Sequence, residues 1–324
     1  MKNKNVIIIT LSTLVILGIL ATIANQQTFS KKKKPSNPTE ATTTDVKEEE
    51  KEIKLTPEQL KEMEIEAVKN SISDNIGNYG NNIAVYYENL QTGTTYSLND
   101  EKYFKGASVR KLGNVMSIAD LIHEGKLSKD KLISYNPNTD YEEGTGILQN
   151  QKKINPITVE KAIELSMTHS DNIAARMLGK IGGYAGPYYE KITGKAAANG
   201  TLTANQVGVL LKRLYDNPDN NPIYEDIIKH LKNTIFHDRL DKYLPYDKVA
   251  HKIGTNFGYY HDAGIIYGDN INYILVILTK NIGDTPITNG EKKEVILKDN
   301  SNAACEIIAK ISNDIYSKLN SIYK

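Results

Sequence analysis

The pattern of apolar and polar positions divides the chain into three unlike parts. The first contains residues 6–24, nineteen positions without a charged side chain. This is close to the ~20 apolar residues that a helix needs to cross a bilayer. Lys2 and Lys4 precede the run, as they do in a secretory signal or an uncleaved signal anchor. We expect a membrane anchor or signal segment over residues 1–24, with an uncleaved anchor favoured, although the lysines at 31–34 argue against a cytoplasmic N-terminus.

The second part, residues 25–55, is polar throughout. It combines a lysine block, two prolines, a threonine run and an acidic cluster, and it cannot bury enough apolar surface to offset the entropy of ordering. We therefore expect a disordered tether. The third part begins at Thr56-Pro57-Glu58, which is typical of a helix start with a cap, a first-turn proline and a first-turn acid. Residues 56–324 then have the length of one large domain or two interleaved ones.

Within residues 56–324 the periodicity changes from strand-like to helical and back. Alternation predicts two strands at residues 82–90 and 93–98, joined by a short turn. The helical period then predicts five helices, at residues 108–125, 158–167, 173–181, 203–215 and 223–233. Strands return at residues 248–255, 261–267 and 273–280, and a terminal helix is expected from Ala303. This order predicts an α+β fold in which one antiparallel sheet accompanies a helical subdomain.

Composition narrows the classes of function. The 40 Lys and Arg residues against 39 Asp and Glu leave a formal charge of +1, which excludes a strongly basic nucleic-acid binder. The single cysteine, Cys305, excludes a disulfide framework within the chain, a multi-cysteine metal site and a lipid-modified cysteine after the apolar segment. No Gly-rich phosphate loop and no His/Asp cluster with metal-ligand spacing is evident. We expect no nucleic-acid partner, no metal and no organic cofactor.

Ser108 and Lys111 are the first candidates for chemistry. They lie three residues apart at the start of a predicted helix, so both side chains share one face. A serine becomes a nucleophile when a base takes its proton, and a lysine can be that base if burial or nearby cations lower its pKa. The pattern alone is weak, because a capping serine beside a solvated lysine is the commoner arrangement. It also recurs elsewhere in the chain, at Ser30/Lys33, Ser128/Lys131 and Ser321/Lys324.

Only Ser108 is followed by further motifs in a recognisable order. Ser170-Asp171-Asn172 lies between predicted helices, and Lys252-Ile253-Gly254-Thr255 ends a predicted strand. With these motifs the chain resembles the penicillin-recognising serine enzymes, specifically the class A β-lactamase-related group, a β-lactamase/transpeptidase-like family. The supporting matches are Gly144 to Gln149, Thr201 to Thr203 and His261 to Ile266, and the resemblance extends from Asn82 to the C-terminus.

The resemblance implies both an architecture and a set of roles. The implied fold is a three-layer α/β/α arrangement: a five-stranded antiparallel sheet packs with terminal helices, and an active-site cleft separates it from an all-helical subdomain. Ser108 would be the acylated nucleophile, Lys111 the general base and Ser170 a proton shuttle to the leaving nitrogen. Asn172 would hold the substrate amide, Lys252 would attract the substrate carboxylate, and Gly254 and Thr255 would bind substrate. The backbone N–H groups of Ser108 and Thr255 would form the oxyanion hole, whereas Asp171 would fix its own turn.

Two departures from the family's pattern bear on the expected function. Ile253 stands where the family has Thr or Ser, so one hydroxyl that helps to bind the substrate carboxylate is missing, and Thr255 or Asn256 would have to replace it. Only 28 residues separate Asn172 from Thr201, and their one acid, Glu190, lacks the family's context for a deacylating glutamate, so a surface role is favoured. We expect β-lactams or the D-Ala-D-Ala termini of peptidoglycan stem peptides to acylate Ser108, with slow deacylation.

Other functions and locations stay open at this stage. The alternatives are a non-turnover penicillin-binding, peptidoglycan-docking or sensor domain, and a small-ester hydrolase on the same fold. The expected location is the cell membrane, with a single N-terminal span and an extracytoplasmic catalytic domain, or secretion if the segment is cleaved. His169 next to Ser170 and Asp171 does not make a triad, because adjacent residues cannot aim at one another. His251 and His261 flank strands, where a satisfied structural histidine is commoner than one that contacts the site.

Overall fold

The computed structural model describes residues 55–283 and 293–324. The expected anchor or signal segment, residues 1–24, lies outside these residues, as does all but the last residue of the expected tether. Within the described ranges, no helix combines the length and the apolar character that crossing a membrane requires.

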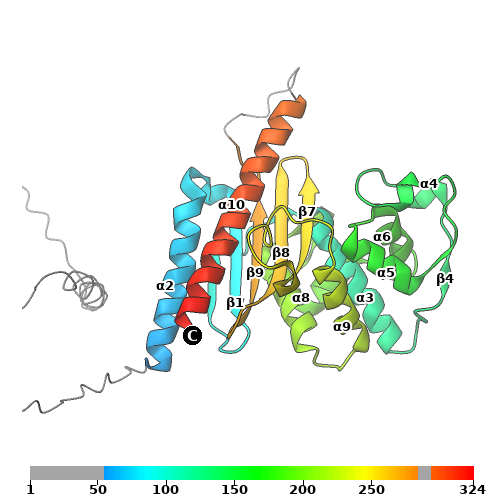
Figure 1. Cartoon of the computed structure of the whole chain (residues 1–324). Helices are drawn as coiled ribbons and strands as arrows, with labels where there is room; N and C mark the ends of the chain where they lie inside the picture. Colours follow the sequence, from blue (N-terminus) through cyan, green and yellow to red (C-terminus); the bar gives the residue numbers. More distant parts are fainter. Residues whose placement is uncertain (1–54, 284–292) are drawn as a thin grey trace, which may run out of the picture. The chain divides into compact units, whose positions relative to one another are not determined.

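A five-stranded antiparallel sheet lies at the centre of the described chain (Figure 1). Its strands run in the order β2 (Thr95–Leu98), β1 (Ile83–Asn89), β9 (Asn272–Thr279), β8 (Tyr259–Tyr267) and β7 (Val249–Asn256). The two early strands therefore pair with the three late ones through β1 and β9, and the helical region is inserted between β2 and β7. Two short ladders stand apart from this sheet: β3 (Phe104–Lys105) with β6 (Thr201–Leu202), and β4 (Leu132–Ile133) with β5 (Ile157–Thr158).

Helices α2 (Pro57–Ile76) and α10 (Lys293–Ile322) lie side by side on one face of the sheet (Figure 1). α2 begins at a capping box in which Thr56 and Gln59 exchange hydrogen bonds, as its first residues predict. Side chains of β1 alternate between the two faces: Ile83, Val85 and Tyr87 pack towards these helices, whereas Ala84 and Tyr86 pack on the other side. Both faces of β1 are buried for this reason.

The remaining helices cover the opposite face of the sheet and extend beyond its β7 edge. They are α3 (Lys111–His123), α4 (Pro137–Asp140), α5 (Val159–Thr168), α6 (Asn172–Gly179), α7 (Ala185–Thr193), α8 (Ala204–Asp216) and α9 (Pro222–Lys232). Short 3-10 turns connect the elements: η1 (Gly77–Asn82), η2 (Ala107–Arg110), η3 (Leu148–Asn150), η4 (Ala198–Gly200) and η5 (Tyr246–Lys248). Polar side chains cap five of these helices at their first turn, and these are Asn136, Thr158, Asp171, Thr203 and Asn221.

The expected fold class is confirmed, although the sequence did not predict α4 or the short ladders β3–β6 and β4–β5. The terminal helix begins at Lys293 rather than at Ala303. Helix α7 was not predicted, because its first turn contains Gly186 and Pro187, which have poor helix propensity. Burial of Tyr188 and Tyr189 stabilises it, and the Tyr188 hydroxyl donates to Asp120 Oδ2 at 2.9 Å.

Candidate active site

A cleft of about 850 Å³ lies between the β7 edge of the sheet and the helical region. Of the residues proposed from the sequence, Ser108, Lys111, Ser170, Asn172 and Thr255 line it. Lys252 and Gly254 lie directly behind this lining and contact it, Lys252 through Ser170 and Gly254 against the segment that carries Ser108. The fold thus brings together all three sequence motifs, which are more than 140 residues apart from first to last.

The first motif places a buried amine beside the Ser108 hydroxyl. Ser108 lies in η2, which runs directly into α3, and Lys111 Nζ is 3.2 Å from Ser108 Oγ. The same Nζ lies 3.2 Å from Ser170 Oγ and 2.6 Å from Asn172 Oδ1. Burial lowers the Lys111 pKa to about 8, although the charges of Glu142 and Asp171 act in the opposite direction. A lysine with such a pKa can accept a proton near neutral pH.

A second amine reaches the site from the sheet. Lys252 on β7 is 1% exposed, and its Nζ donates to Ser170 Oγ at 2.9 Å and to the Ile253 carbonyl at 2.9 Å. Burial, together with the charge of Lys111, lowers the Lys252 pKa well below its ordinary value. The Ser170 hydroxyl is therefore flanked by two amines, an arrangement through which a proton can pass.

The turn that carries Ser170 is held by the loop that precedes it in sequence. Asp171 accepts hydrogen bonds from the backbone N–H groups of Ile147 (2.8 Å), Leu148 (2.9 Å) and Ala174 (3.0 Å), so it fixes its turn as expected. Ser170 itself adopts a left-handed φ of 50°, which is uncommon for a residue with a side chain. A Cβ at Gly146 would lie 2.4 Å from Asp171 Cγ. The loop can therefore lie this close to Asp171 only because residue 146 is a glycine.

The segment that carries Ser108 lies against β7 at Gly254. A Cβ on this glycine would lie 3.0 Å from Val109 Cγ2 and 3.2 Å from the Val109 backbone nitrogen. Ala107, directly before Ser108, has a φ of 44°, a second left-handed position in the site. The backbones of Ser108 and Thr255 thus border the cleft from two adjacent segments, as an oxyanion hole formed by both would require.

Arg239 is a site residue that sequence reasoning missed. It is 3% exposed in the loop between α9 and β7, and its Nη2 donates to Thr255 Oγ1 at 2.7 Å. Its Nη1 donates to the carbonyls of Gly254 (3.1 Å) and His261 (2.8 Å). Because Thr255 Oγ1 accepts from Arg239, its hydroxyl hydrogen is able to donate towards the cleft. No local motif marks Arg239, and only the path of its loop brings it here.

The acids of the cleft come from the segment before Ser170 rather than from the one after Asn172. Glu142 and Glu143 line the cleft, and Glu142 is paired with Arg176 at 2.6 Å. Glu190 is exposed on α7 and is not among the residues that line the cleft.

The histidines singled out from the sequence take structural positions. His261 is buried, its Nε2 donates to the Lys105 carbonyl at 2.8 Å and its Nδ1 accepts from Thr279 N at 3.0 Å. Burial lowers the His261 pKa to about 4, so the ring is neutral. His169 contacts the Thr168 hydroxyl at 2.7 Å. His251 is buried beside Asp262, on the face of β7 that points away from Lys252.

Comparison with known proteins gives a family match and a shared fold. The profile of the beta-lactamase enzyme family matches residues 67–319. A β-lactamase from Sphaerobacter thermophilus is 15% identical, with a TM-score of 0.66 over 79% of this chain and 97% of its own. The TLA-3 extended-spectrum β-lactamase is 18% identical (TM-score 0.66, 79% and 99%), and PBP-A is 19% identical (TM-score 0.59, 74% and 94%). At these identities the structural likeness shows the fold alone. No curated protein matches the chain.

Proposed function

The chain belongs to the beta-lactamase enzyme family, and we propose that it is a serine hydrolase in which Ser108 forms an acyl-enzyme with β-lactams or with D-Ala-D-Ala peptides. One observation carries this proposal: two buried amines, of Lys111 and Lys252, converge on the hydroxyls of Ser108 and Ser170 inside a single cleft. Buried lysines with lowered pKa values are the groups that can activate a serine without a histidine. A mutant of PBP-A, 20% identical to this chain, was determined as an acyl-enzyme complex with penicillin G.

Acylation would proceed by proton transfers along these hydroxyls. Neutral Lys111 takes the Ser108 proton as Oγ attacks the amide carbonyl, and a tetrahedral oxyanion forms. The backbone N–H groups of Ser108 and Thr255 would stabilise that oxyanion, a contribution of about 3 kcal/mol for one donor in other serine hydrolases. Ser170 then gives its proton to the leaving nitrogen and regains one from Lys111. The C–N bond breaks, and the carbonyl carbon stays bound to Ser108.

The substrate carboxylate would bind at the end of β7. Lys252 supplies positive potential there, and Thr255 supplies a hydroxyl whose oxygen is held by Arg239. Ile253 lines the same cleft with a side chain that donates no hydrogen bond. We infer that Thr255, oriented by the Arg239 guanidinium, replaces the donor that Ile253 removes.

Release of the acyl group is proposed to be slow. Fast deacylation needs a water molecule and a base placed against the ester carbonyl. Glu190 does not line the cleft, and of the two glutamates that do, Glu142 is engaged by Arg176 and Glu143 lies before Ser170, outside the interval in which the family carries its deacylating glutamate. Slow release favours a penicillin-binding protein or D,D-peptidase over an efficient β-lactamase. It also keeps one alternative open, a sensor domain that traps a β-lactam without turnover.

The proposed location is the cell membrane, with residues 6–24 as the anchor and the catalytic domain outside the cytoplasm. The apolar run and the polar segment after it support this location. Peptidoglycan stem peptides and β-lactams are both met on that side of the membrane.

Time-resolved mass measurement of the intact protein after addition of penicillin G tests the proposal. We expect a single adduct with the mass of the whole antibiotic, which persists long after free penicillin is removed. Ser108→Ala abolishes the adduct, whereas Ser128→Ala, in an exposed Ser-x-x-Lys pattern outside the cleft, keeps it. Absence of any adduct on the natural chain would refute acylation. Rapid return to the unmodified mass would refute slow release and favour a β-lactamase.

A further inference from the structure

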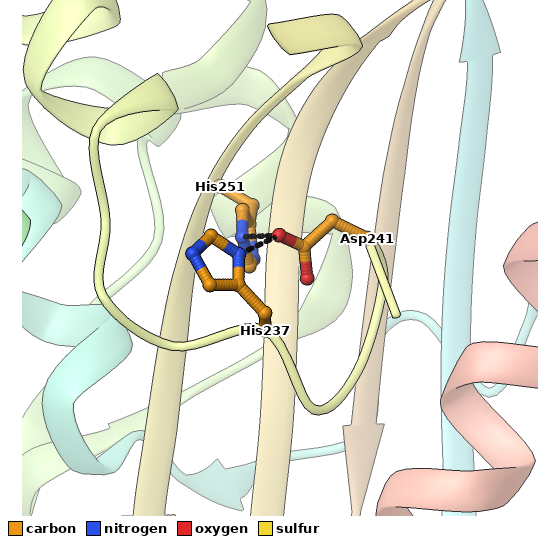
Figure 2. A group of neighbouring side chains, drawn as sticks. All are labelled: His237, Asp241 and His251. Carbon is orange, nitrogen blue, oxygen red and sulfur yellow. Dashed lines mark hydrogen bonds and ion pairs between the residues drawn. The ribbon is translucent and has the colours of Figure 1, made fainter. Parts of the chain in front are cut away.

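On the face of β7 that points away from Lys252, His237, Asp241 and His251 converge on one point (Figure 2). His251 Nε2 lies 3.2 Å from Asp241 Oδ2, and His237 Nδ1 contacts the same oxygen. One atom from each residue can be chosen such that all three lie within 4.8 Å of one another. The sequence shows no His/Asp cluster with metal-ligand spacing, and only the fold brings these three residues together. Two of the three lie in the irregular loop between α9 and β7, so no regular spacing revealed the cluster.

Two buried atoms of this cluster lack hydrogen-bond partners among the described protein groups. They are Asp241 Oδ1 and His251 Nε2. His251 and Asp241 are 0% and 1% exposed, so neither atom is compensated by bulk water. Although Nε2 is close to Asp241 Oδ2, the contact lacks hydrogen-bond geometry. Buried polar atoms without partners are rare because each costs free energy. His251 Nε2 faces the Asp241 Oδ2 oxygen and the His237 ring, whereas Asp241 Oδ1 points away from both rings (Figure 2).

Asp262 on β8 fixes the orientation of the His251 ring. His251 Nδ1 lies 2.8 Å from Asp262 Oδ2 and 3.0 Å from Oδ1, which directs Nε2 towards Asp241. Asp262 is itself held, because it accepts from Leu240 N at 3.0 Å and from Ala263 N at 2.9 Å. A histidine that gives one ring N–H to a carboxylate and presents its other nitrogen to neighbouring ligands is the arrangement found in metal sites.

We propose that His237, Asp241 and His251 form a zinc-binding site, with Asp262 orienting His251 from behind. Two imidazoles and one carboxylate are ligands that suit Zn²⁺ in tetrahedral geometry, whereas hard cations such as Mg²⁺ prefer oxygen ligands alone. Tetrahedral bonds of about 2 Å place ligand atoms about 3.3 Å apart, close to the 3.2 Å between His251 Nε2 and Asp241 Oδ2. His237 Nδ1 is hydrogen-bonded to Asp241 Oδ2, so the His237 ring would have to move away from this oxygen to admit the ion. The His237 side chain is 30% exposed, so solvent and a metal ion can reach the cluster from this side.

The site has a structural consequence for the cleft. It joins the loop between α9 and β7 to β7 itself, and Arg239 lies in that loop, two residues from each of His237 and Asp241. Arg239 holds the Gly254 carbonyl and the Thr255 hydroxyl on the cleft side of the strand. Zinc would therefore stabilise the end of β7 where substrate is proposed to bind, without contacting substrate.

Binding of Zn²⁺ alone to the full chain, after treatment with a chelator, tests the site. We expect one equivalent in equilibrium dialysis with metal analysis, and a rise in Tm of about 3 °C or more at saturating zinc. Mg²⁺ at the same concentration leaves Tm unchanged. Co²⁺ in place of Zn²⁺ should give the visible absorption of a tetrahedral site. The absence of zinc binding would overturn the proposal and favour an imidazolium of His251 between two carboxylates.

Substitutions in and outside the cluster test whether the bound zinc ion lies at this site. The His237 ring stacks on the Tyr246 ring, with 4.0 Å between the two centroids. His237→Phe keeps an aromatic ring in this stack but removes the ligand nitrogen. We expect it to weaken zinc binding by about tenfold or more, as Asp241→Asn should. His123→Phe, at an exposed histidine outside the cluster, keeps full affinity. Undiminished zinc binding by His237→Phe would overturn the assignment. If Asp241→Asn does not fold, the result for His237→Phe is sufficient to test the site.

Discussion

At the scale of single residues, the chemistry of the site depends on the environment of Lys111. Its Nζ contacts the oxygens of Ser108, Ser170 and Asn172, and burial lowers its pKa to about 8. A Ser-x-x-Lys spacing places the amine next to the hydroxyl, but the spacing is the same for the exposed pair Ser128/Lys131. Only burial distinguishes a base from a solvated cation, because desolvation disfavours the charged form.

The lowered pKa predicts how acylation depends on pH. The base must be neutral, and Lys111 is neutral only above its pKa of about 8. The acylation rate with penicillin should therefore fall about tenfold per pH unit below about pH 8 and level off above it. Measurement of the second-order rate constant across this range checks the prediction.

A charge near the amine offers a sharper version of this test. The Glu142 carboxylate raises the Lys111 pKa, so Glu142→Gln should move the inflection to lower pH. Glu143→Gln serves as the matched control, because Glu143 also lines the cleft but does not contribute to the Lys111 shift. A rate that does not change with pH, or an inflection that moves equally in both variants, would contradict the role of Lys111 as the base.

At the scale of elements, a buried carboxylate joins α2 to the sheet and to the C-terminus. Glu64 on α2 is 0% exposed and accepts from the hydroxyl of Tyr87, from Asn89 Nδ2 at 3.0 Å and from the Tyr323 hydroxyl at 2.6 Å. Burial and the Glu64 carboxylate together raise the Tyr87 pKa far above its usual value, so its hydroxyl stays a donor. α2 is thus attached to the sheet by polar contacts as well as by its apolar side chains.

Removal of this carboxylate should destabilise the fold. Glu64→Ala leaves the buried donors of Tyr87 and Asn89 without their acceptor, and we expect a loss of about 3 kcal/mol in the free energy of unfolding. Urea denaturation followed by circular dichroism measures it. Glu62→Ala, at an exposed position of the same helix, should change stability by less than about 0.5 kcal/mol. Equal effects of the two substitutions would show that the Glu64 contacts contribute nothing.

At the scale of the whole molecule, the described residues contain the two apolar cores, one on each face of the sheet, and every residue of the proposed sites. The sheet is closed by strands from both ends of this region, since β1 pairs with β9, and α2 packs with α10. Folding and acylation should therefore depend on residues 54–324, and attachment to the membrane on residues 1–53.

Deletion of residues 1–53 tests this division of roles. The shortened chain should keep the Tm and the acylation rate of the full chain, because no residue of either core or of the cleft is removed. Cell fractionation should find the full chain with membranes and the shortened one in the soluble fraction. A shortened chain that fails to fold, or a full chain that leaves the membrane fraction on its own, would contradict the proposed organisation.

The sequence by itself determined the type and order of most elements and the side chains that we propose to react. Hydrophobic periodicity and capping residues act over a few neighbours, and so do the spacings that mark Ser108, Ser170 and Lys252. The tertiary structure alone decided the rest. Burial sets the pKa of Lys111, the loop before β7 brings Arg239 to Thr255, and the same loop brings His237 and Asp241 to His251. These features depend on contacts between segments distant in sequence, which no local pattern encodes. Helix α7 also depends on tertiary contacts, since its buried tyrosines stabilise it despite the low helix propensity of its first turn.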